Sequence, residues 1–220
     1  MSRGRWPKAE LWRVSVGGEE WVVKDFRPRG FFTRHLIGAL LARREARALR
    51  RLAGVPGVPA GAFLVDRFAL AYRFVPGVPL ATIPGREQPK ELFEALEETM
   101  RQVHARGIAH LDIRNCRNVI VSEGNRPVLL DFESHLGTGG ALSGLRGALE
   151  RFDLGGVYKH WRRAKPATLG PEREALLEDM NRWRKAWVFR GMWFYPRELG
   201  KLRRRIATRL GGANRNEDRK

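Results

Sequence analysis

The feature that most constrains this chain is a segment in its middle where polar and apolar residues follow in a fixed order. Residues 110–121 read His-Leu-Asp-Ile-Arg-Asn-Cys-Arg-Asn-Val-Ile-Val, and residues 128–133 read Val-Leu-Leu-Asp-Phe-Glu. Two short apolar runs separated by a turn at Gly124-Asn125 predict a β-hairpin. A polar loop followed by an ordinary edge hairpin is the simpler interpretation. The complete order of polar residue, strand, turn, strand and Asp-Phe favours a functional site.

This order resembles the catalytic loop and metal-binding motif of the protein-kinase-like superfamily, where His-x-Asp-x4-Asn precedes a hairpin ending in Asp-Phe-Gly. The resemblance implies that Asp112 accepts the proton of the acceptor hydroxyl. It also implies that Asn118 and Asp131 hold the Mg²⁺ ions that bridge the phosphates of ATP. Amide and carboxylate oxygens suit this hard cation. We expect His110 and Phe132 to pack the loop.

Two departures from the superfamily pattern matter. The gap between Asp112 and Asn118 is one residue longer than usual, so Asn115 competes with Asn118 as metal ligand. Asn118 is favoured because it directly precedes the apolar strand. Glu133 replaces the glycine of Asp-Phe-Gly, which points away from an ordinary protein kinase and towards small-molecule and lipid-sugar kinases.

The resemblance extends upstream to Val22-Val23-Lys24, which is similar to the strand whose lysine pairs with the α- and β-phosphates. Glu45 follows on a predicted helix, where the superfamily keeps the partner of that lysine. Glu45 is also the only acidic residue between positions 43 and 51. A solvent-facing Lys24, and a Glu45 that pairs along its own helix with Arg50 or Arg51, are the alternatives.

Three further features bear on nucleotide binding. The segment 72–80 resembles the hinge between the two kinase lobes, whose backbone meets adenine. Tyr72 and Phe74 are therefore candidate nucleotide-binding residues. The simpler interpretation, a strand ending in a turn, is compatible with this role. Asp153 either braces the catalytic loop or caps a helix N-terminus. Gly17-Gly18 indicates a tight hairpin instead of Gly-x-Gly-x-x-Gly, which argues against strong nucleotide affinity.

Hydrophobic periodicity and turn signals predict a two-lobed α+β protein, and the resemblance implies that this is a protein-kinase-like fold. A reduced N-lobe over residues 1–75 has an antiparallel sheet and one helix, a mostly helical C-lobe covers 76–210, and residues 211–220 form a disordered basic tail. The expected strands lie within 11–26, 63–75 and 119–130. A basic loop over 27–35 and a mobile Gly-rich loop over 137–147 join helices predicted at 36–52, 89–106, 145–163, 171–188 and 196–210.

The chain is strongly basic, with 42 Lys and Arg residues against 24 Asp and Glu residues and a net charge of +18. Such a charge predicts an anionic partner. From Arg182 to Lys220 there are 13 basic and 3 acidic residues among several aromatic ones, a composition typical of segments attracted to anionic membranes. Cys116 is the single cysteine, which excludes an internal disulfide and a cysteine-based metal site. Without a secretion signal or a spanning apolar run, we expect a cytoplasmic protein, peripheral on the inner face of the cell membrane.

At the family level the chain resembles bacterial lipopolysaccharide kinases, which phosphorylate Kdo or heptose sugars, over about residues 11–160. The features are Val-Lys-Asp-Phe before a basic loop, the arginine-rich helix and Asp-Phe-Glu. The resemblance implies ATP- and Mg²⁺-dependent phosphorylation of a sugar hydroxyl in the inner core or a similar anionic glycolipid. A Rio-like serine/threonine protein kinase with a nucleic-acid-associated partner and a pseudokinase binding module remain open. An RNA-binding protein of another fold ranks lowest, because no helix-turn-helix, RRM or zinc pattern is visible.

Overall fold

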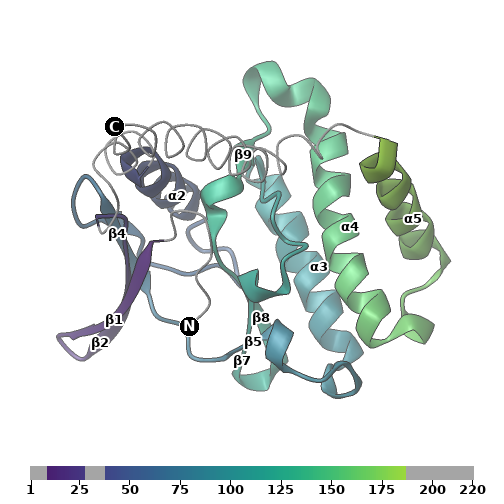
Figure 1. Ribbon diagram of the computed structural model, residues 1–220, viewed down its shortest axis with the longest axis horizontal. Helices are drawn as coiled ribbons and strands as arrows, with labels where there is room; N and C mark the ends of the chain where they lie inside the picture. The colour runs from purple at the N-terminus through teal and green to yellow at the C-terminus, as the bar shows by residue number, and fades with distance from the viewer. Residues whose placement is uncertain (1–8, 28–37, 187–220) are drawn as a thin grey trace, which may run out of the picture. The chain divides into compact units, whose positions relative to one another are not determined.

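The computed structural model describes residues 9–27 and 38–186 (Figure 1). Residues up to Met180 form one compact unit. Most of the predicted basic loop, the start of the first predicted helix, the basic helix at 196–210 and the tail at 211–220 lie outside the described residues. The predicted lobe boundary after residue 75 falls between two strands, β4 (Ala69–Arg73) and β5 (Val78–Pro79).

The first sheet is antiparallel and has the strand order β1-β2-β4-β3. Its other strands are β1 (Glu10–Val16), β2 (Glu19–Asp25) and β3 (Phe63–Leu64). Gly17 and Gly18 both have positive φ, +60° and +79°, as a two-residue type I′ hairpin requires. The predicted tight hairpin is therefore confirmed. The pairing register places Lys24 on an inner strand, opposite Leu70.

The helix α2 (Ala39–Arg51) carries its apolar residues on the side that packs against β4 and against the 3-10 helix Phe132–Ser134. Ala42, Ala46 and Leu49 are buried, whereas the arginines at 43, 47, 50 and 51 are exposed. Glu45 lies on the buried side with only 1% of its surface exposed. A buried glutamate among small apolar residues requires a partner of opposite charge.

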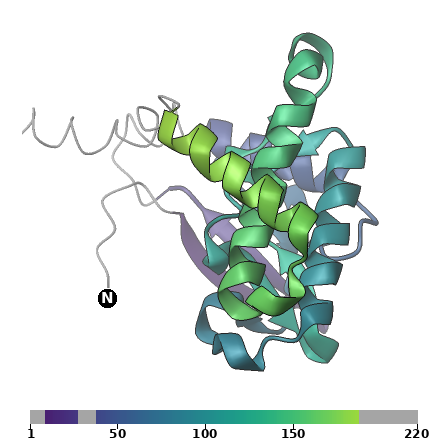
Figure 2. The ribbon, with the colours of Figure 1, turned by 90° about the vertical axis from the view of Figure 1, so that its right-hand side faces the viewer.

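Three helices form the second part of the unit: α3 (Lys90–Ala105), α4 (Arg146–Ala164) and the beginning of α5 (Pro171–Ala186). The predicted apolar face of α3 is confirmed, because Leu92, Leu96, Met100 and Val103 are all buried. α3 and α4 lie side by side in both ribbon views (Figures 1 and 2). The ring of Phe93 stacks on that of Trp161, with centroids 5.8 Å apart.

Short elements complete the second part. β7 (Val119–Ser122) and β8 (Arg126–Leu129) form the predicted hairpin, β5 pairs with β7, and β6 (Ile108–Ala109) pairs with β9 (Leu136–Gly137). The segment 137–147, predicted to be a mobile loop, instead contains the end of β9, a 3-10 helix and the start of α4. Backbone pairing of Thr138 with Gly107 anchors it. The other 3-10 helices are Leu80–Thr82, Gly85–Glu87, Cys116–Asn118, Glu123–Asn125, Phe132–Ser134 and Pro166–Thr168.

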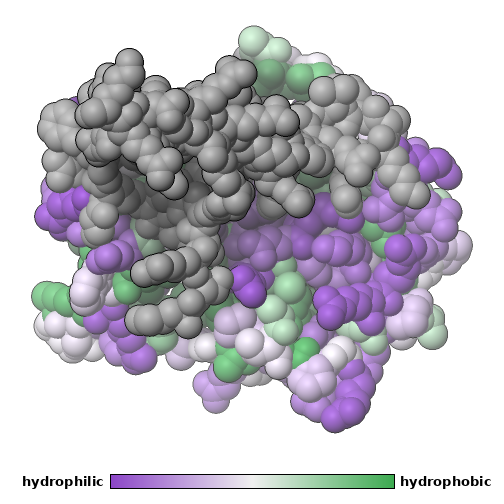
Figure 3. All heavy atoms as spheres, viewed as in Figure 1, coloured by the Kyte–Doolittle hydropathy of each residue, from purple (hydrophilic) through white to green (hydrophobic). Residues whose placement is uncertain are grey.

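The described surface is largely hydrophilic on the face shown in Figure 3, with apolar side chains as separate spots and a green patch over the loop before α4. None of the helices in the described ranges is long and apolar enough to span a membrane.

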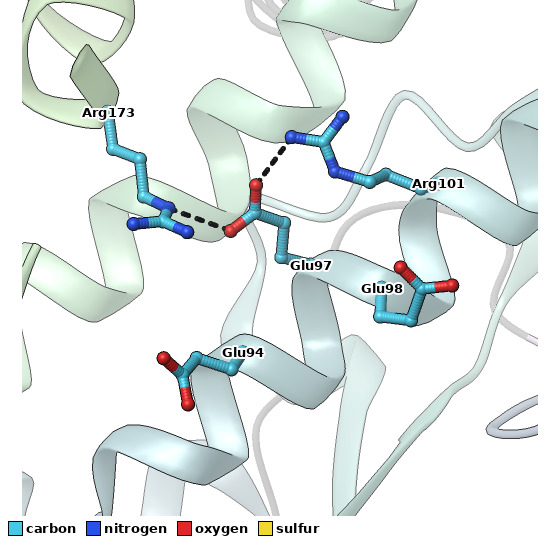
Figure 4. Close-up of a pocket in the computed structure, with 5 residues that line it drawn as sticks. All are labelled: Glu94, Glu97, Glu98, Arg101 and Arg173. Carbon is cyan, nitrogen blue, oxygen red and sulfur yellow. Dashed lines mark hydrogen bonds and ion pairs between the residues drawn. The ribbon is translucent and has the colours of Figure 1, made fainter.

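A cavity of about 340 Å³ lies over α3 and is lined by Glu94, Glu97, Glu98, Arg101 and Arg173. Figure 4 shows two of these side chains converging on Glu97. Arg101 donates to one oxygen of Glu97 at 2.7 Å, and Arg173 from α5 donates to the other at 2.8 Å. The Tyr158 hydroxyl of α4 adds a third bond at 2.8 Å. Glu97 therefore ties α3 to α4 and α5.

We predict that Glu97→Ala lowers the free energy of unfolding by about 1–3 kcal/mol, because it leaves the buried Tyr158 hydroxyl without its acceptor. Glu94→Ala is the matched control, since Glu94 lies one turn away on the same helix and makes an exposed pair with Lys90. Its loss should stay below about 1 kcal/mol. Urea denaturation measures both values, and equal losses would contradict the assignment of Glu97 as the central contact.

Candidate active site

The Lys24 ammonium group lies among three carboxylates. Its Nζ is 2.8 Å from Glu45 Oε2, 2.9 Å from Asp131 Oδ1 and 2.5 Å from Glu133 Oε1. Burial lowers the pKa of Lys24, but the charges of Glu45, Asp131 and Glu133 outweigh it and hold that pKa well above the usual value. Lys24 therefore stays charged. The alternatives of a solvent-facing Lys24 and a Glu45 paired along its own helix are both wrong, because both side chains are buried and bonded to each other.

The catalytic-loop segment places Asn118 against Asp112. Asn118 Nδ2 donates to Asp112 Oδ2 at 2.8 Å and to the Asp112 backbone oxygen at 3.1 Å. Asn115 donates to Asn118 Oδ1 at 3.2 Å and accepts from the Arg117 amide, which caps the 3-10 helix Cys116–Asn118. Both amides adjoin Asp112: Asn118 donates to its carboxylate directly, and a hydrogen bond with the Asn115 side chain also lowers the pKa of Asp112, against the larger rise that burial causes.

The environment of Asp112 suits a proton acceptor. Burial raises the pKa of Asp112, and the bond from Asn118 partly offsets this rise. A carboxylate with a raised pKa takes up a proton more readily than an ordinary one. Its orientation is fixed by Asn118 before any substrate arrives.

The two ends of the β7–β8 hairpin are joined to this loop. The Leu130 amide donates to the Asn118 carbonyl at 2.8 Å, and His110 Nε2 donates to the Leu130 carbonyl at 3.0 Å. The His110 ring lies 4.6 Å from that of Phe132, centroid to centroid, so both residues pack the loop as predicted. Asp131 follows directly in a left-handed backbone conformation, φ +66°. These contacts bring Asp112, Asn118 and Asp131 into one connected network with Lys24.

Asp153 braces the catalytic loop from α4. It is fully buried and accepts from the His110 amide at 2.7 Å, the Leu111 amide at 2.8 Å and His104 Nε2 at 3.0 Å. The alternative of a helix N-cap is wrong, because Asp153 lies inside α4, which begins at Arg146. Leu111 has φ +66°, a conformation that costs roughly 1–2 kcal/mol for a residue with a side chain. Asp153 holds the backbone there by accepting hydrogen bonds from two consecutive amides, those of His110 and Leu111.

At the predicted hinge, the Phe74 amide donates to the Glu20 carbonyl at 2.9 Å, so sheet pairing uses its N–H. The role of Phe74 in nucleotide binding stays a prediction. The Phe74 ring lies 4.1 Å from the Arg13 guanidinium. Tyr72 is buried in β4, and burial, with the Glu45 charge, raises the pKa of its hydroxyl. The Tyr72 side chain therefore lies close to Lys24 and its carboxylate partners.

Sequence reasoning missed two residues of this region. Glu133 was noted only as a replacement for glycine, yet it contacts Lys24. His160 donates from Nε2 to the Ile113 carbonyl at 2.9 Å, and burial lowers the pKa of His160 to about 4, which keeps the ring neutral. Asp153, Gly156 and His160 lie three and four residues apart on one helix, so they share a face. A side chain at Gly156 would place its Cβ 2.4 Å from Ile113. The three- and four-residue spacing of these residues was the sequence pattern that could have identified this face.

Comparisons with known proteins show the fold. No family model and no curated protein matches this sequence. The structure is similar to that of the Rio2 kinase–ADP/Mg²⁺–phosphoaspartate complex from Chaetomium thermophilum, with a TM-score of 0.57 and 15% identity over 83% of this chain and 69% of that one. A second structure of Rio2 kinase from the same organism gives 0.57 and 14%, over 82% and 70%. The chain therefore has the predicted protein-kinase-like α+β fold.

We predict that Asp153→Asn lowers the free energy of unfolding by about 2 kcal/mol or more. The amide group replaces one acceptor oxygen with a donor, which leaves buried N–H groups unsatisfied. Asp179→Asn is the matched control, because Asp179 forms a more exposed pair with Arg151 and should cost under about 1 kcal/mol. Urea denaturation of the two variants tests this, and a loss at Asp153 no larger than at Asp179 would refute the brace.

Proposed function

We propose that this protein is an ATP- and Mg²⁺-dependent phosphotransferase that phosphorylates an alcohol group. The main support for this proposal is that Asp131 links Lys24 to the loop that carries Asn118. Asp131 bonds to Lys24, 107 positions earlier in the chain, and follows the strand whose end is hydrogen-bonded to Asn118. A phosphate-binding cation, two oxygen ligands and an oriented base thus lie in one network. Phosphoryl transfer relies on this positioning and on charge neutralisation.

The donor set at Asp131 and Asn118 fits Mg²⁺. Both side chains offer hard oxygen atoms, and the Asp131 side chain is 42% exposed, so it is open to solvent. Asn118 and Asp131 would hold the metal, which supplies charge neutralisation of the phosphates. Lys24 would bind the nucleotide phosphates, with Glu45 fixing its position. Asp112 would take the proton of the acceptor hydroxyl.

The acceptor we propose is a sugar hydroxyl of the lipopolysaccharide inner core or a similar anionic glycolipid. Support comes from the sequence resemblance and from the basic residues near the catalytic loop. Arg114 and Arg117 belong to that loop, and Lys159 of α4 donates to the Arg114 carbonyl at 3.1 Å. Arginine suits phosphates and carboxylates on a substrate. The protein would then act in the cytoplasm at the inner face of the cell membrane, with the basic C-terminal region as its contact.

A Rio-like protein kinase is the second candidate, and the likeness to Rio2 kinase structures is consistent with it. It would use the same residues, with a protein hydroxyl as acceptor. A pseudokinase is the third, because the Gly17-Gly18 turn is too short to cover phosphates. The charged residues Lys24, Asp112 and Asp131 argue against it, since a binding module does not need them together.

Transfer of labelled γ-phosphate from ATP and Mg²⁺ into a lipopolysaccharide extract, beside a protein extract, tests the proposal. We expect label in the glycolipid. Asp112→Asn should reduce it by about a hundredfold or more, because the base is lost, while nucleotide binding persists. Label only in protein would move the assignment to the Rio-like candidate. Absence of label in both extracts would refute the phosphotransferase and favour the pseudokinase.

A further inference from the structure

Glu133 occupies the position on Lys24 that a nucleotide phosphate needs. A lysine ammonium has three N–H donors, and here three carboxylates surround it, those of Glu45, Asp131 and Glu133. The donors are therefore all engaged. A phosphate oxygen can reach Lys24 only if one carboxylate moves away.

The burial and the reach of the three side chains together indicate which one moves. Glu45 is 1% exposed and sits on α2, so its departure would leave a buried charge without a partner. The Asp131 side chain is 42% exposed, but it is short and its backbone is left-handed, so its carboxylate has less reach than that of Glu133. Glu133 has a longer, flexible side chain that is 25% exposed. Glu133 can rotate into solvent at the smallest cost.

The backbone that carries Glu133 is fixed, so the displacement involves its side chain. Phe132 before it is fully buried. His135 after it accepts a bond from Arg44 of α2 at its carbonyl, at 2.5 Å, and its own Nδ1 donates to the Phe132 carbonyl at 2.6 Å. Glu133 is thus held beside Lys24 as a competing anion.

Three carboxylates surround one ammonium group, which leaves an excess of negative charge even though burial raises the pKa of Glu45 to about 7. A phosphate without a metal ion is repelled by this excess, whereas a phosphate that arrives with a divalent cation balances it. Building on the proposed function, we propose that Glu133 is a specificity-determining residue that excludes metal-free nucleotide, so that the site accepts the nucleotide only as its divalent-metal complex.

The test measures the dissociation constant of ADP with Mg²⁺ and with EDTA by calorimetry, for the full chain and for Glu133→Gln. We expect the ratio of the two constants (EDTA over Mg²⁺) to fall about tenfold in Glu133→Gln, because the metal-free nucleotide loses one repulsive charge and a competitor. Glu133→Gly, which removes the side chain entirely, should change the ratio in the same direction. Thermal unfolding checks that each variant is folded.

Glu123→Gln is the matched control. Glu123 lies in the exposed turn between β7 and β8, and its loss changes the net charge by the same amount. We expect its ratio to stay within about twofold of the unmodified protein, because distant exposed charges are screened. An unchanged ratio in the Glu133 variants, with ADP still bound, would overturn the role of Glu133 alone. A chain that binds no ADP with Mg²⁺, in any variant, would overturn the proposed function as well.

Discussion

A buried ammonium group must be balanced by negative charge, and in this protein that requirement joins the two halves of the site. Lys24 comes from the first sheet, Glu45 from α2, and Asp131 and Glu133 from the turn after β8. Loss of the ammonium group would leave three carboxylates within 4.8 Å of one another, and like charges at such distances repel strongly. The sheet, the helix and the turn are therefore held in register by one cation.

The loop that carries Asp112 depends on a second support, the face of α4 that carries Asp153, Gly156 and His160. Asp153 fixes the left-handed Leu111 backbone, Gly156 lets the loop approach the helix closely, and His160 bonds to the next carbonyl along the loop. The buried face of α4 thus supports the loop that carries the partly exposed Asp112, and local backbone strain is maintained by hydrogen bonds from outside the loop.

Much of this site follows from local order in the sequence. The motif from His110 to Asp131 specifies its own hairpin, and the apolar spacing of α3 specifies its buried face, so both could be predicted. The contact of Glu133 with Lys24 joins residues far apart in the chain, and no local pattern encodes it. The pairing of the Phe74 amide with Glu20 could not be predicted either, because an amide at a strand end can pair with the sheet or with a ligand, and only the register decides. Asp153 was ambiguous because an aspartate near the start of a helix also resembles an N-cap.

We propose that the Lys24 cluster and the Asp112 loop together form a site for a metal–nucleotide complex. Anomalous scattering from a crystal grown with Mn²⁺ and ADP tests it most directly, because Mn²⁺ favours the same oxygen ligands as Mg²⁺. We expect a manganese peak beside Asn118 and Asp131, with a phosphate oxygen bonded to Lys24. A manganese peak held elsewhere, or a nucleotide whose phosphates do not touch Lys24, would contradict it.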